Sequence, residues 1–92
     1  MTCIVYSASR VVAERKLQEI ARDNNTVVVQ SHYDMHVVTD ADYWMWVNPE
    51  NDIARGYCSY KAFVDTRCSI KTLHYIIMPG FRGSSDDMRF FE

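Results

Sequence analysis

The sequence predicts a single α/β (α+β) domain built on a mixed β-sheet of four to six strands with two main helices. Three observations predict it. A short β-branched strand, Cys3–Tyr6, is followed by a turn and an amphipathic helix. Three strand-like segments then follow in close succession. A second strand and helix complete the order β-α-β-β-β-β-α, with an optional last strand. A chain of 92 residues encloses only one hydrophobic core, so residues 1–92 form one domain.

The first helix has the clearest signals. Its apolar residues recur with the spacing of one helical face, and they are Val12, Ala13, Leu17, Ile20 and Ala21. Ser9 is the expected N-cap, because its side chain can accept a free backbone N–H of the first turn. Asn24-Asn25 is the expected end, because Asn tolerates the left-handed conformation that terminates helices.

Three strands are expected to form an antiparallel meander, at Thr26–Gln30, Met35–Thr39 and Tyr43–Val47. Consecutive valines make the first of them a candidate central strand. A loop with one helical turn at Asp52–Arg55 follows. Because a crossover helix follows the first strand of the chain, we expect one parallel strand pair, with helices on one or both faces of the sheet.

The last third of the chain is expected to hold a strand at Lys61–Asp65 and a helix that Ser69 caps and Pro79-Gly80 ends. The apolar face of this helix is predicted to comprise Ile70, Leu73, Ile76 and Ile77. Met88–Phe91 is expected as a last edge strand or as a frayed tail, within a partly flexible segment 80–92.

Composition excludes some functions. Ten basic residues are scattered among twelve acidic ones, for a formal net charge of −2, which disfavours nucleic acid as the main partner. Three cysteines without CxxC spacing favour neither a disulfide framework nor a zinc knuckle, and they fit a reducing cytoplasm. The start of the chain does not read as a signal peptide, and no apolar run is long enough to cross a bilayer. We expect a soluble cytoplasmic protein that does not act on a membrane.

The strand Tyr43–Val47 is the most informative segment, because both of its sides are apolar. If helices cover only one face of the sheet, Trp44 and Trp46 lie on the open face and anchor a partner together with Tyr43 and Tyr33. If helices cover both faces, the two tryptophans belong to the core.

A short, aromatic-rich chain with this strand and no catalytic motif resembles the small accessory proteins of bacteriophages and mobile elements, including inhibitors of host defence of the anti-CRISPR kind. The resemblance implies a non-enzymatic binding protein, without cofactor or metal, that docks on a host protein in the host cytoplasm and inhibits or modulates it. Self-association as a homodimer, through the aromatic face or the terminal strand, is a further alternative.

An alternative function rests on the turn between the first strand and its helix. Ser7, Ser9 and Arg10 lie where a helix N-terminus attracts anions, and Asp65 ends an apolar strand as a magnesium-binding acid does. The glycines and the Lys-Ser/Thr pair of a phosphate-binding loop are absent, so a plain capped turn is the preferred interpretation.

Ile4-Val5-Tyr6 with Arg10 and Glu14 resembles the opening of a second RecA-like helicase domain, and Ala54-Arg55-Gly56-Tyr57 resembles its RGY-type loop. The resemblance, to a shrunken helicase- or terminase-type P-loop core, covers about half of the chain. It implies a nucleotide- or phosphate-binding module or enzyme, with phosphate near the first turn and a metal near Asp65.

Other groupings are interpreted as structural. His32, Asp34 and His36 alternate and would share one side of a continuous strand, but a turn at the first two spoils a metal site. Cys58 and Cys68, with His74 as a base, lack evidence of an activating environment. The acid pairs Asp40/Asp42 and Asp86-Asp87 lie in turns and loops that do not fix a working distance.

Overall fold

The computed structural model describes residues 1–32, 34–50 and 57–92. Tyr33, the helical turn expected at Asp52–Arg55 and all but the last residue of the loop 54–57 lie outside the described residues. Within the described part, no helix is both long enough and apolar enough to span a bilayer.

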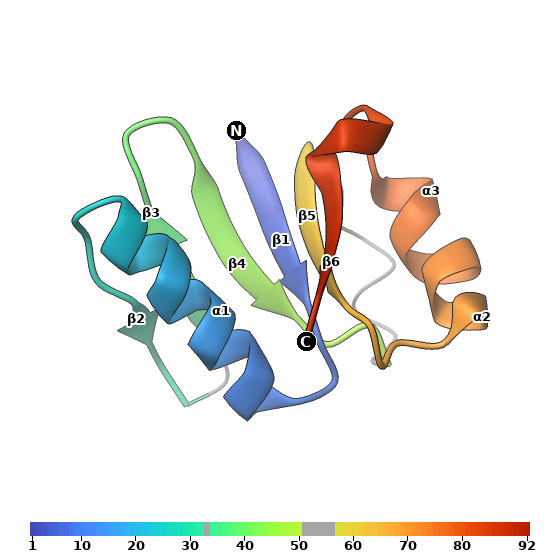
Figure 1. Ribbon diagram of the computed structural model, residues 1–92, viewed down its shortest axis with the longest axis horizontal. Coiled ribbons are helices and arrows are strands. Elements are labelled where there is room, and N and C mark those ends of the chain that lie inside the picture. The colour runs from blue at the N-terminus through green and yellow to red at the C-terminus, as the bar shows by residue number, and fades with distance from the viewer. Residues whose placement is uncertain (33, 51–56) are drawn as a thin grey trace.

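Six strands form one mixed sheet in the order β2-β3-β4-β1-β5-β6 (Figure 1). The strands are β1 (Thr2–Tyr6), β2 (Val29–Gln30), β3 (Met35–Val38), β4 (Tyr43–Val47), β5 (Lys61–Asp65) and β6 (Met88–Phe91). The helical elements are α1 (Arg10–Asp23), a second helix made of α2 (Ile70–Thr72), η2 (Leu73–Ile77) and α3 (Met78–Gly80), and the short 3-10 turn η3 (Ser85–Asp87). The predicted order β-α-β-β-β-β-α-β is confirmed, including the optional last strand.

Parallel pairing is more extensive than expected. β1 pairs in parallel with β4 and with β5, and β5 pairs in parallel with β6. The expectation of one parallel pair is therefore wrong, because the connections from β4 to β5 and from β5 to β6 both return the chain to the same end of the sheet. The meander β2-β3-β4 is antiparallel, as predicted.

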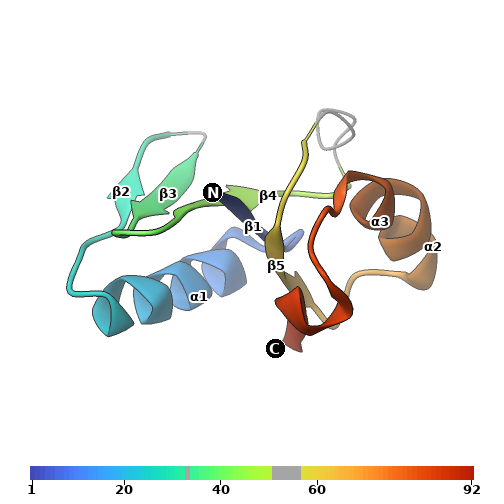
Figure 2. The same cartoon turned by 90° about the horizontal axis from the view of Figure 1, so that it is seen from above.

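The two main helices lie on opposite faces of the sheet. The connection through α1 runs toward the β2 edge, whereas the connection through α2–α3 runs toward the β6 edge. Because strand crossovers are right-handed, connections that run in opposite directions place their helices on opposite faces. Figure 2 shows α1 beside the meander half of the sheet and α2–α3 beside the other half.

Each helix therefore builds its own core layer on β1. The layer under α1 contains Cys3, Val5, Leu17, Met35, Val37 and Trp44. The layer under the second helix contains Ile4, Tyr6, Val47, Ala62, Val64 and Ile77. β1 is buried on both faces, which explains its continuous apolar sequence.

The ends of α1 are as predicted. The Ser9 hydroxyl accepts the backbone N–H of Val12 at 3.3 Å, so Ser9 is the N-cap. Asn25, just beyond the helix, has φ 55°, the left-handed conformation that Asn tolerates.

The strand expected at Thr26–Gln30 is shorter and lies elsewhere in the sheet. Only Val29–Gln30 is a strand, and it forms the edge rather than the centre. The backbone N–H of Thr26 donates to Ala21 O at 2.9 Å, so the end of α1 still holds the start of this segment. The central position is closed to β2, because β4 pairs with β1 on one side and β3 on the other.

The second helix begins as predicted, with the Ser69 hydroxyl accepting the backbone N–H of Thr72 at 3.0 Å. It ends at Pro79-Gly80, as expected. Ile70 is not on the buried face but 85% exposed, whereas Ile77 is fully buried. Leu73, Ile76 and Ile77 pack against the core, as predicted, and the helix contains a π-helical turn, η2, in which Met78 N–H donates to Leu73 O.

Candidate docking surface

The aromatic strand β4 divides its side chains between the two faces. Trp44 is 7% exposed beneath α1 and stacks on Phe63, with ring centroids 5.4 Å apart. Trp46 lies on the same face and is partly buried. Its indole N–H donates to Ser7 O at 2.9 Å, and the Arg10 guanidinium lies 5.6 Å from its ring centroid. Of the two tryptophans predicted at a docking surface, Trp44 is thus a core residue and Trp46 is largely engaged within the chain.

The other face of the meander is open. Within the described residues, the second helix packs over β1 and β5, and the outward side chains of β2, β3 and the start of β4 are at least partly exposed. Val29 lies opposite His36, and Val38 lies opposite Tyr43, so these four residues share one face. We call them the meander face. Met45, opposite His36, continues this surface into the core.

The meander face is apolar and ordered by ring stacking. Val29 is 49% exposed, Val38 is 54% exposed and Tyr43 is 40% exposed. The His36 and Tyr43 rings are stacked, with centroids 5.2 Å apart and planes inclined by 19°. Such stacking restricts the two side chains before any partner arrives.

The surroundings of the meander face are acidic. The sequence has no Lys or Arg between Arg22 and Arg55 but six acidic residues there. Asp34 and Asp40 are exposed at the two ends of β3. Asp42 instead binds Lys61, with Oδ2 and Nζ 3.0 Å apart.

A second candidate site lies at the carboxyl ends of β1 and β5. Here the connections diverge toward opposite edges, and in open α/β sheets such a switch point is where ligands bind. The structure brings Ser7, Ser9 and Asp65 together at this place. A hollow of about 240 Å³ beside them is lined by Ala8, Ser9, Glu50, Asp65, Arg67 and Cys68.

Asp65 is satisfied by donors of the chain itself. The Ser7 hydroxyl donates to Oδ2 at 2.8 Å, Arg67 Nη2 donates to Oδ2 at 3.0 Å, and the backbone N–H and Nε of Arg67 donate to Oδ1. Burial would raise the pKa of Asp65, but these hydrogen bonds hold that pKa below its ordinary value. The carboxylate is charged, and both of its oxygens accept hydrogen bonds from Ser7 or Arg67.

Arg10 does not join this group. Its guanidinium reaches the other way and donates to Ser31 O at 3.0 Å and to His32 O at 3.4 Å. The basic residue near Asp65 is Arg67, two positions along the chain. Asp65 and Arg67 are two positions apart in a turn, and this spacing was a sequence signal for their pairing that the sequence analysis missed.

The remaining sequence candidates do not form chemical sites in the described residues. His36 Nδ1 lies 4.0 Å from Asp34 Oδ1, and no three potential metal ligands cluster in the part of the chain that the structure describes. Burial raises the pKa of the Cys68 thiol to about 11, so this thiol is protonated at neutral pH. Cys58 is exposed, and His74 packs edge-on against Tyr75.

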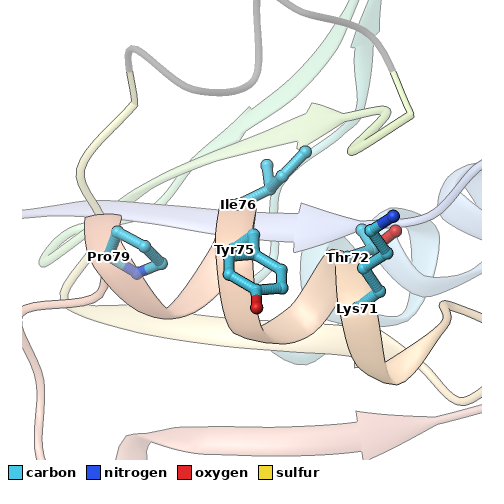
Figure 3. A pocket seen from close by; sticks show the side chains of 5 residues that line it. All are labelled: Lys71, Thr72, Tyr75, Ile76 and Pro79. Carbon is cyan, nitrogen blue, oxygen red and sulfur yellow. The ribbon is translucent and has the colours of Figure 1, made fainter.

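The second helix carries a hollow that sequence reasoning missed (Figure 3). It measures about 490 Å³ and is lined by Lys71, Thr72, Tyr75, Ile76 and Pro79. These residues all come from one helical segment. The segment includes the π-helical turn η2, which nothing in the sequence indicated.

Comparisons of the chain with protein-family models, curated proteins and solved structures found no match.

Proposed function

We propose that this protein is a non-enzymatic binding protein, which docks on a partner protein through the meander face and inhibits or modulates it. The resemblance to phage accessory proteins implies a host protein as the target. The observation that supports the proposal is the gathering of exposed apolar side chains, Val29, Val38 and Tyr43, on one uncovered half of the sheet.

Burial supplies the driving force for such docking. Each square ångström of apolar surface removed from water contributes roughly 25 cal/mol. Tyrosine is enriched at the energetic centres of interfaces, because its ring is large and loses little conformational freedom on binding. Tyr43 is already stacked on His36, so still less freedom is lost there.

Charge defines the partner's chemistry. Asp34 and Asp40 border the meander face, and the meander contains no Lys or Arg. A complementary partner surface presents an apolar centre with Lys or Arg at its rim. Such a rim raises the association rate, and the effect falls with added salt.

Affinity capture from a bacterial lysate with mass spectrometry tests this proposal. The double variant V38K/Y43S changes two exposed residues of the meander face. The matched control is Val11→Lys, a change of an exposed valine on α1, which covers the opposite face. We expect the native chain and Val11→Lys to capture the same proteins in equal amounts, and we expect V38K/Y43S not to capture them. Capture of the same proteins by all three chains would refute the meander face as the docking surface.

The alternative, a nucleotide- or phosphate-binding module, is supported by the position of Ser7, Ser9 and Asp65 at the switch point. It is opposed by the internal pairing of Asp65 and by Glu50, a second acid at the same hollow. Magnesium with ATP should raise the melting temperature if this alternative holds, because a ligand of the native state stabilises it by mass action. An unchanged melting temperature would favour the docking function.

A further inference from the structure

The segment Thr26–Gln30 is a strand-forming sequence of which only part is used. Three consecutive valines have high β-propensity, yet only Val29–Gln30 pairs with a neighbour. Val27 is 71% exposed and Val29 is 49% exposed. The segment forms the outer edge of the sheet beyond β3.

The backbone of this edge points outward at alternate residues. Val29 lies opposite His36, and Ser31 N–H donates to Asp34 O at 2.8 Å, so residues 29 and 31 face β3. In an antiparallel ladder the intervening residues face the other way. Val28 and Gln30 therefore present their N–H and C=O groups at the open edge.

This edge is short but lacks the charge or proline that guards many sheet edges. Exposed edge strands are commonly protected by a very short length, Lys, Pro, a bulge or an inward charge, which prevent pairing with another chain, and β2 has two residues. Residues 26–30 contain no charge and no proline. At the opposite edge of the sheet, β6 carries Arg89.

We propose that the edge at Thr26–Gln30 pairs with the same segment of a second copy, antiparallel about a two-fold axis at Val28. Val28 then lies opposite Val28 of the second copy, and Gln30 lies opposite Thr26. Because Thr26 N–H already donates to Ala21 O, this register uses the outward N–H and C=O groups of Val28 on both chains and sets each Gln30 N–H against Thr26 O. It is self-complementary, as a two-fold interface must be, and it sets no like charges against each other.

The side chains also fit this register. Val27 lies opposite Val29 of the second copy, and both project to the side of the meander face. Pairs of β-branched residues across strands stabilise sheets. The two meander faces then lie on the same side of one continuous sheet, so the dimer presents a doubled apolar surface. The pairing itself does not require the proposed docking function.

Sedimentation velocity over a concentration series tests the pairing. We expect a reversible shift from monomer to dimer as the protein concentration rises, because the association follows mass action. Amide hydrogen exchange at Val28 and Gln30 should slow as the concentration rises, because these N–H groups become bonded in the dimer.

Two variants make the test specific. Gln30→Pro removes an outward donor, and Val27→Lys replaces an exposed valine, so both should fold, as circular dichroism will check. Each should weaken dimerisation roughly tenfold or more, since two symmetric contacts are lost. V38K/Y43S should dimerise like the native chain, which separates this inference from the docking proposal. A monomer at every concentration, or a dimer unaffected by both edge variants, would overturn the inference.

Discussion

Ser7 Oγ donates a 2.8 Å hydrogen bond to Asp65 Oδ2, which joins the carboxyl ends of β1 and β5 across 58 positions of the chain. Both residues are buried, at 0% and 2% exposure. Arg67 completes the arrangement from the surface side. The group occupies the switch point of the sheet with an internal ion pair, so its clearest effect is on stability.

Stability should therefore depend on pH through Asp65. Its folded pKa lies below its ordinary value, so its contribution is present above the unfolded pKa and is lost as the pH falls through the folded pKa. Urea denaturation of the native chain should show this loss below about pH 4, where an unfolded Asp titrates.

Asp65→Asn should weaken the fall in the free energy of unfolding below about pH 4. It should also destabilise the protein by about 2 kcal/mol at neutral pH, because it removes a charged acceptor and leaves buried donors without a well-matched partner. Asp86→Asn is the control, because Asp86 is exposed. If both variants lose stability at acid pH to the same extent as the native chain, the internal pairing of Asp65 does not contribute as described.

Gly80→Ala should destabilise the fold by about 2 kcal/mol, because overpacking forces backbone to shift. A Cβ at Gly80 would lie 2.2 Å from Tyr57 O, a backbone atom that the neighbouring Ser59–Phe81 bridge helps to hold. Met78→Ala, at an exposed position of the same helix, is the control. Equal denaturation midpoints for the two variants would show that the segment around Tyr57 can yield.

The three cysteines should differ in reactivity. Cys58 is exposed, whereas burial raises the pKa values of Cys3 and Cys68 to about 11. Since the thiolate is the reactive form, a disulfide reagent at neutral pH should modify one thiol quickly in the native protein and three in denaturant. Cys58→Ser should abolish the fast phase. A fast phase that survives this change would place a reactive thiol at Cys3 or Cys68.

The helices and strands could largely be predicted from the sequence, because periodicity, caps and β-branched runs are local signals. Tyr43–Val47 and Lys61–Asp65 are strands with the predicted bounds. Sheet position was harder: Val27, Val28 and Val29 looked central, but their place depends on which strands flank β1. The predicted face of the second helix is largely correct, since Leu73, Ile76 and Ile77 pack against the core, but Ile70 at its start is exposed.

The candidate sites followed the same division. The resemblance to a P-loop core grouped Ser7, Ser9 and Asp65 at one candidate site, and the structure brings these three residues together. The resemblance also grouped Arg10 with them, but side-chain direction depends on contacts, and Arg10 turns to Ser31 O. The sequence did not predict which side of Tyr43–Val47 is exposed. Both sides of this strand are apolar, and only the positions of the helices decide which side stays open.

The two tryptophans should respond differently to truncation. Trp44→Ala removes a buried indole that stacks on Phe63, and loss of a large aromatic from a core costs about 3–5 kcal/mol. Trp46→Ala removes a partly buried ring and one hydrogen bond, to Ser7 O, so its cost should be smaller. Urea denaturation monitored by far-UV circular dichroism measures both changes. If the variants are equally stable and both retain the native fold, Trp44 is not held in the core, and the surface under α1 becomes a candidate docking surface beside the meander face.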